Sequence, residues 1–169
     1  MTDRRTRKSD EAIRAAFLRL LFTIRFETIS MSRLAAEADV SRSTLYQHYP
    51  TRERVLQASM AHIIDALANA LAGDFDAEEI DPTLVHFWEN RRLTRAVFGP
   101  PVDAQVRRWL AEAVENKLIA AGRTANDARL AAIPAAAGTI ALLDQWMTGH
   151  LDVPRADIAR SLVGRVAGA

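Results

Sequence analysis

The chain has 169 residues and a formal net charge of +1; 49% of its residues are hydrophobic and 25% are charged. This length suits one helical domain, or a small head fused to a larger core, and the composition is ordinary for a soluble protein. The absence of cysteine excludes disulfides and thiolate metal sites, and no apolar run approaches the ~20 residues that a membrane span needs. We therefore expect a soluble cytoplasmic protein.

The charge is unevenly distributed along the chain. Residues 1–57 hold 11 Lys/Arg and 7 Asp/Glu, a balance of +4, whereas the remainder holds 11 and 14, a balance of −3. Such asymmetry suggests a polyanionic partner for the N-terminal end. A chance imbalance on solvated faces explains the charge pattern equally well, so a sharper signal is needed.

Three short helices are predicted before Pro50. Apolar residues three and four positions apart mark the first of them over residues 13–24. A second should cover residues 31–38, with Ser30 as its N-cap, because a serine hydroxyl can accept from the unpaired amides of the first turn. A third should follow Ser41 and end before Pro50, since the residue preceding a proline is disfavoured in helical geometry.

The rest of the chain also predicts helices. In order we expect a long helix over 51–72, an acidic loop over 74–81, and helices over 82–98, 106–122, 124–149 and 154–166. Asp81 followed by Pro82 is the favoured order for a helix start, and Pro134 should kink the helix that contains it. No segment alternates as a strand would. The predicted fold is all-α: a three-helix head over 1–50 is joined by a long helix to a C-terminal helical bundle over 51–169 that dimerises.

Residues 30–49 form the most informative segment. Two short helices joined by a tight turn over 38–41 are typical of a helix-turn-helix, whose second helix enters the major groove of DNA. Asp39 stands where the turn should need a positive φ, which aspartate tolerates better than most residues. The second helix should turn Leu45 inward. Its outward side chains can hydrogen-bond to base edges and phosphates: Arg42, Ser43, Thr44 and Gln47.

The stretch Val40–Tyr49, with Thr51-Arg52-Glu53 after it, resembles the signature of the TetR family of transcriptional regulators. Residues 34–38 also match that family's second helix, so the resemblance covers about residues 10–57. Two positions depart from the family pattern: Asp39 replaces the usual turn glycine, and Arg25 replaces the glycine usual between the first two helices. Both should reduce local stability without abolishing the fold.

The resemblance implies a role for each matching residue. Ser30 would bind a backbone phosphate, and Ser41 would cap the groove-entering helix at the DNA surface. Tyr46, His48 and Arg52 would bind phosphate oxygens. Arg42, Ser43, Thr44 and Gln47 would face the groove. The function implied is a sequence-specific regulator, most simply a repressor that a small-molecule effector releases from its operator, with no metal or other cofactor.

The body is expected to dimerise through its last two helices. The segments 124–149 and 154–166 carry an excess of apolar residues, including Leu143 and Trp146, and small residues that let helices approach closely. A four-helix interface between two subunits accounts for that pattern. An ordinary core helix within one subunit is the alternative.

An effector pocket is expected among the middle helices, which carry aromatic residues and arginines that could hold an apolar or anionic molecule. The candidate residues are Phe87, Trp88, Arg91 and Trp109. The same side chains could instead be core residues and surface charges.

Two other classes of function are weighed against a DNA-binding regulator. An enzyme would need a phosphate-binding glycine loop, a nucleophile with its base, or clustered metal ligands, and the sequence offers none of these patterns. A helical protein-interaction module with a vestigial DNA-binding head would share the fold. Binding to a specific operator separates the regulator from both.

Overall fold

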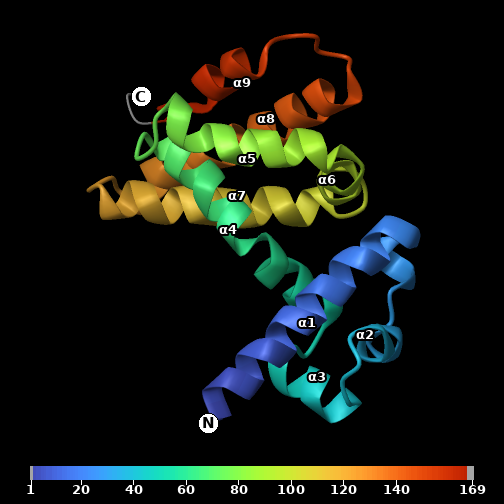
Figure 1. Ribbon diagram of the computed structural model, residues 1–169. Coiled ribbons are helices and arrows are strands. Elements are labelled where there is room, and N and C mark those ends of the chain that lie inside the picture. Colours follow the sequence, from blue (N-terminus) through green and yellow to red (C-terminus); the bar gives the residue numbers. More distant parts are fainter. Residues whose placement is uncertain (1, 167–169) are drawn as a thin grey trace. The chain divides into compact units, whose positions relative to one another are not determined.

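The computed structural model describes residues 2–166, the first four of these by their backbone alone. Within that range all regular secondary structure is helical, as predicted. The elements are α1 (Thr2–Thr23), the 3₁₀ turn η1 (Phe26–Thr28), α2 (Met31–Glu37), α3 (Arg42–His48), α4 (Arg52–Ala72), α5 (Ala77–Glu89), α6 (Arg91–Phe98), α7 (Asp103–Ala120), α8 (Ala125–Thr148) and α9 (Arg155–Leu162) (Figure 1).

The chain divides into two compact units, Met1–Ala61 and His62–Ala169. The division falls inside α4, so the first half of this helix belongs to the N-terminal unit, the head, and the second half to the C-terminal unit, the body. From the sequence, the domain boundary is expected after residue 50, which would place all of α4 in the body. That domain boundary stays a prediction.

In the head, α1, α2 and α3 contact one another around a small apolar core (Figure 1). Ile13 and Phe17 of α1 are fully buried, as are Leu34 of α2 and Leu45 of α3. Each side chain lies on the stripe that its helical spacing predicts, because burying an apolar stripe is what holds a short helix in place. The three-helix head of the predicted fold is therefore present.

The helix starts in the head are set by serine caps. The Ser30 hydroxyl accepts from the Arg33 amide at 3.2 Å, and the Ser41 hydroxyl accepts from the Thr44 amide at 3.0 Å. Between α2 and α3, Asp39 has φ 52°, the left-handed conformation that the turn was expected to need. The helix-turn-helix geometry predicted from the sequence is confirmed.

Helix α5 begins earlier than its proline suggests. Asp76 caps it by accepting from the amides of Glu78 and Glu79, and the Glu79 carboxylate accepts in return from the Asp76 amide at 2.8 Å. This reciprocal capping box satisfies amides of the first turn and starts the helix at Ala77, with Pro82 inside it. The prediction of a loop over 74–81 is wrong, because two of its acidic residues, Asp76 and Glu79, form the N-terminal cap of α5.

The helix predicted over 82–98 is two helices. It breaks at Asn90, whose amide side chain donates to the His86 carbonyl at 3.0 Å and whose own carbonyl accepts from the Thr94 hydroxyl at 3.1 Å. Asparagine competes in this way for backbone groups that would otherwise continue the helix. As a result, α5 ends at Glu89 and α6 begins at Arg91.

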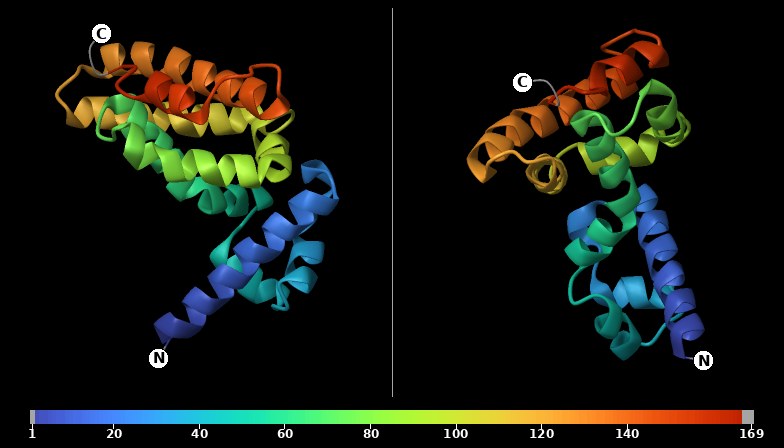
Figure 2. Two further views of the ribbon diagram at one scale, coloured as in Figure 1. Left: turned by 45° about the horizontal axis from the view of Figure 1, so that its top comes forward. Right: turned by 90° about the vertical axis from the view of Figure 1, so that its left-hand side faces the viewer.

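The body is built mainly on α7 and α8, which lie side by side along most of their length (Figure 2). Helix α9 packs on α5 and buries Ile158, Ala159 and Leu162. The chain then returns to α4, where the Gly164 amide donates to the Ala70 carbonyl at 2.8 Å.

Two helices, α4 and α8, are long and apolar enough to cross a membrane by length and composition alone. The relevant window is 56% buried in α4 but only 39% buried in α8. No uninterrupted apolar run of that length exists in the sequence, because isolated polar and charged residues divide both helices.

Candidate nucleic-acid interface

Helix α3 has one buried face and one polar face. Leu45 is fully buried, and Tyr49, which follows the helix, is 9% exposed. Arg42, Ser43 and Gln47 are exposed on the opposite side. Among the described residues nothing engages the side chains of Arg42 and Gln47 by a hydrogen bond or ion pair. The helix therefore presents uncommitted donors and acceptors on a rigid frame, as recognition of base edges requires.

The hydroxyls at the start of α3 form a connected group. Besides accepting from the Thr44 amide, the Ser41 oxygen lies 2.9 Å from the Ser43 hydroxyl and 2.8 Å from the Thr44 hydroxyl. These bonds fix the first turn of α3, and all three side chains remain at least partly exposed. Tyr46, on the same helix, is 53% exposed.

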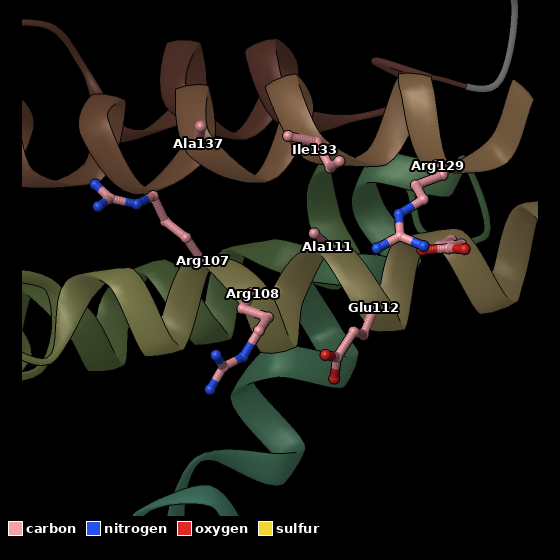
Figure 3. Close-up of a pocket in the computed structure, with 8 residues that line it drawn as sticks. Arg107, Arg108, Ala111, Glu112, Arg129, Ile133 and Ala137 are labelled. Carbon is pink, nitrogen blue, oxygen red and sulfur yellow. The ribbon is translucent and has the colours of Figure 1, made fainter. Parts of the chain in front are cut away.

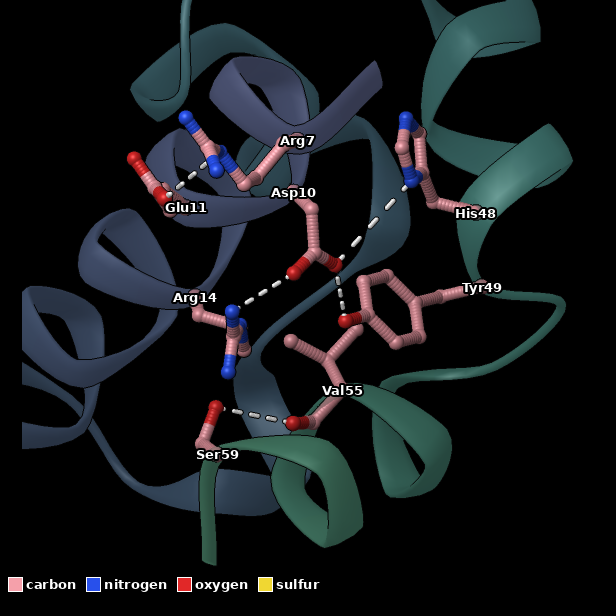
Figure 4. A network of polar contacts seen from close by, with 8 residues as sticks. All are labelled: Arg7, Asp10, Glu11, Arg14, His48, Tyr49, Val55 and Ser59. Carbon is pink, nitrogen blue, oxygen red and sulfur yellow. Dashed lines mark hydrogen bonds and ion pairs between the residues drawn. The ribbon is translucent and has the colours of Figure 1, made fainter. Parts of the chain in front are cut away.

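Asp10 of α1 anchors the end of α3 (Figure 4). Its carboxylate accepts a hydrogen bond from the Tyr49 hydroxyl and lies 2.6 Å from Nη2 of Arg14. The His48 Nδ1 lies 4.0 Å from the same carboxylate. From the sequence, His48 is expected to bind a phosphate oxygen. One of its ring nitrogens is directed toward Asp10, which leaves the other available to a partner.

The Tyr49–Asp10 contact makes the head sensitive to alkali. Burial, and then the neighbouring Asp10 carboxylate, hold the pKa of Tyr49 well above its usual value of 10. A folded-state pKa above the unfolded one stabilises the head fully below pH 10, and this stabilisation falls as pH rises further. We expect Tyr49→Phe to lose part of that alkaline dependence, measured by denaturant unfolding between pH 8 and 11. An unchanged pH profile would contradict this assignment.

Ser30 and Arg52 are both committed to the fold of the head. Ser30 is the N-cap of α2, as described above. The Arg52 Nη1 donates to the Glu27 carbonyl at 2.6 Å and to the Ile29 carbonyl at 3.2 Å, and its Nε donates to the Glu53 carboxylate at 3.0 Å. Arg52 thus ties the start of α4 to η1, and Nη2 is the part of its guanidinium that no hydrogen bond engages among the described residues. The sequence could not show these bonds, which join residues more than 20 positions apart.

The N-terminal segment of the chain resembles known proteins in sequence. The family model for bacterial regulatory proteins of the tetR family matches residues 13–59, the segment that builds the helix-turn-helix. The helix-turn-helix segment of the chain is therefore similar to the DNA-binding segment of that family. The match supports DNA binding by the segment that contains α2 and α3. A search of curated proteins finds no match to the sequence.

Solved structures resemble the chain over nearly its whole length. The repressor NalD of Pseudomonas aeruginosa has a TM-score of 0.57 and 18% identity, with 93% of each chain covered. The dihydroxyacetone kinase operon activator DhaS has a TM-score of 0.55 and 15% identity, with 91% of each chain covered. A TetR regulator from Rhodococcus sp. RHA1 has a TM-score of 0.52 and 18% identity, covering 92% of this chain and 94% of the other. At these identities the likeness concerns the fold alone.

The four expected effector residues do not share one environment. Phe87 is fully buried, with its ring centroid 5.3 Å from that of Phe98, and Trp109 is 9% exposed. Trp88 is 45% exposed, and its ring centroid lies 5.1 Å from that of Trp146. The Arg91 guanidinium lies 5.5 Å from the Trp88 ring centroid. The structure therefore places two of the four in the core and two at the surface.

A cavity of about 320 Å³ lies on α7 and α8, and none of those four residues lines it (Figure 3). Its lining comprises Arg107, Arg108, Ala111, Glu112, Glu115, Arg129, Ile133 and Ala137. None of these residues was predicted from the sequence to line a pocket. A signal was available, since Leu130, Ile133 and Ala137 recur at helical spacing beside charged positions.

Proposed function

We propose that this chain is a TetR-family regulator, a homodimeric repressor that acts in the cytoplasm on operator DNA and is released by a small-molecule effector. The observation that carries the DNA-binding part is the outer face of α3, where Arg42 and Gln47 are exposed and uncommitted. In a dimer the two copies of α3 would lie in successive major grooves about 34–36 Å apart. Bound there, the protein would occlude the promoter.

The proposed base contacts follow from side-chain geometry. The Arg42 guanidinium matches the O6 and N7 acceptors of guanine, and the Gln47 amide matches N6 and N7 of adenine. Ser43 and Thr44 are short and can contact either base edges or the sugar-phosphate backbone. Their hydroxyls are already ordered by Ser41, so little side-chain freedom is lost on binding.

The proposed phosphate contacts surround α3. Tyr46 is the most exposed of them, and its hydroxyl is free among the described residues. His48 would donate from the ring nitrogen that faces away from Asp10. Ser30 and Ser41 lie at the starts of α2 and α3, where first-turn amides point outward and favour a phosphate. Arg52 would contribute its free Nη2 group.

Repression is proposed rather than activation because occlusion needs only the dimer and its operator. The structural likeness does not decide the sign, since one of the similar proteins is named a repressor and another an activator. The runner-up function, an interaction module with a vestigial head, is disfavoured by the polar face of α3. A vestigial face has no reason to keep Arg42 and Gln47 exposed beside an ordered group of hydroxyls.

The effector part of the proposal rests on the body. Trp88 and Arg91 form an exposed aromatic and cationic pair suited to an apolar or anionic molecule. The Thr139 hydroxyl of α8 is buried with no hydrogen-bond partner among the described residues, a state that costs about 1–3 kcal/mol. An effector that supplies this partner while preferring one dimer conformation would shift the population away from the DNA-bound state. Phe87 and Trp109 would shape the site from the core.

Selection from a pool of random duplexes tests the DNA-binding proposal directly. The full chain should enrich a motif with two related half-sites, and its affinity for that motif should fall steeply with salt, as phosphate contacts require. Equal binding to all sequences, or no binding at low salt, would favour the vestigial-head alternative.

A further inference from the structure

His48 is a titratable side chain at the edge of the proposed DNA-binding face. It is the last residue of α3, and its side chain is 14% exposed. Its Nδ1 faces Oδ1 of the Asp10 carboxylate at 4.0 Å (Figure 4). In the proposed complex with DNA, Nε2 on the other side of the ring donates to a phosphate oxygen. The protonation of the ring decides whether Nε2 can donate at all.

The Asp10 carboxylate offers the His48 ring acceptor atoms only. Its Oδ1 already accepts from the Tyr49 hydroxyl, and its Oδ2 lies 2.6 Å from Nη2 of Arg14. At 4.0 Å the contact between Oδ1 and Nδ1 is electrostatic rather than a direct hydrogen bond. A negative oxygen at this position favours a proton on Nδ1, because a bare lone pair there would face the negative charge.

No second charge competes with Asp10 for His48. Within the described part of the chain, Asp10 is the group that forms an ion pair with this ring. The other charged side chains on α1, α2 and α3 form no ion pair with His48, and they include Arg7, Glu11, Arg14, Arg33, Glu37 and Arg42. The position of the imidazole proton is therefore set by Asp10.

We propose that operator binding takes up a proton at His48, one in each subunit, and that Asp10 is the positioning residue that makes this proton necessary. The inference rests on the proposed phosphate contact of His48. A neutral imidazole carries one N–H, which Asp10 draws to Nδ1, so that Nε2 is left as a bare acceptor. A phosphate oxygen also only accepts, and the two groups repel each other until Nε2 is protonated.

This coupling predicts that acid strengthens operator binding. The proton comes from the solvent, and the resulting imidazolium donates from both nitrogens, toward Asp10 and to the phosphate. Because histidine changes charge between pH 5 and 8, affinity should fall as pH rises from 6 to 9, by up to about tenfold per pH unit and per subunit. Tyr49 stays protonated throughout, since its pKa is held above 10.

The first test measures operator affinity of the full chain from pH 6 to 9 at constant ionic strength. His48→Gln should remove the pH dependence, because a glutamine amide donates equally well at every pH in this range. His62→Gln is the matched control, since His62 is an exposed histidine of α4 outside the proposed DNA contacts. It should keep both the affinity and the pH dependence of the unsubstituted chain.

Asp10→Asn tests the positioning role. Arg14 can only donate, so it should hold the amide oxygen of Asn, and the amide NH₂ should then face the His48 ring. Nδ1 would become the acceptor and the neutral ring would carry its proton on Nε2, ready for phosphate. We therefore expect this variant to bind the operator with little pH dependence. Circular dichroism checks that its head remains folded.

Nitrogen NMR of the histidine-labelled free protein at pH 9 reads the proton position without DNA. The unsubstituted chain should carry the His48 proton on Nδ1. The inference is wrong if that proton lies on Nε2, or if His48→Gln keeps the full pH dependence, and neither result depends on the folding of Asp10→Asn. Absence of operator binding at every pH would instead contradict the proposed function.

Discussion

Replacing Arg42 and Gln47 together by alanine should reduce affinity for the selected operator at least about thirtyfold per half-site, while leaving binding to unrelated DNA nearly unchanged. A bidentate contact to a base is worth about 1–3 kcal/mol, so two lost contacts cost at least about 2 kcal/mol. Both side chains are exposed and uncommitted in the free protein, so their removal should not disturb the head. Equilibrium titration of labelled duplexes measures both affinities.

The matched control is Arg160→Ala. Arg160 is an exposed arginine of α9 whose carboxylate partner, Asp157, lies three residues away on the same helix. It should leave both affinities unchanged. An equal loss of specific and unrelated binding in the double variant would mean that Arg42 and Gln47 bind phosphates rather than bases.

Replacing Phe87 by alanine should lower the free energy of unfolding by about 3–5 kcal/mol, the range for removing a large buried aromatic residue. Phe87 is fully buried and its ring meets that of Phe98 edge-on, so the cavity left behind would lie in the core of the body. Chemical denaturation of the full chain, followed by circular dichroism, measures the change.

Trp88→Ala is the comparison that separates core from surface. Trp88 is 45% exposed, so its removal uncovers less buried area than removal of Phe87. Loss of its ring contact with Trp146 should lower the free energy of unfolding by about a further 0.5–1.5 kcal/mol. A Phe87→Ala variant as stable as Trp88→Ala would show that Phe87 lines an open pocket rather than the core.

Much of the head could be predicted because its determinants are local. Ser30 and Ser41 each cap a helix by accepting from the backbone amide three residues later in the chain. Asp39 adopts the positive φ that its place in the turn requires. Such signals lie within a few neighbouring residues, so a single sequence shows them.

The sequence misled where two local helix-start signals compete, and it gave no information where two contacting residues are distant in the chain. Asp81-Pro82 resembled a helix start, but the capping box of Asp76 and Glu79 starts α5 earlier. The Tyr49–Asp10 bond joins residues 39 positions apart, and helical spacing gives no sign of it.

The surface of the body was harder still to predict. Periodicity identifies the apolar side chains of α8 but does not say which of them meet the same chain and which meet a partner. Trp146 faces inward onto Trp88, while Leu130 and Ile133 remain exposed. Only tertiary packing separates the two groups.

The central claim is that α3 reads bases in the operator, and site-specific photo-cross-linking tests it most directly. A photoreactive residue in place of Gln47 should cross-link to bases within the selected half-site, at one defined position. The same residue in place of Ala15, which is exposed on α1, should give no base cross-link. Base cross-linking from position 15 but not from position 47 would contradict the claim.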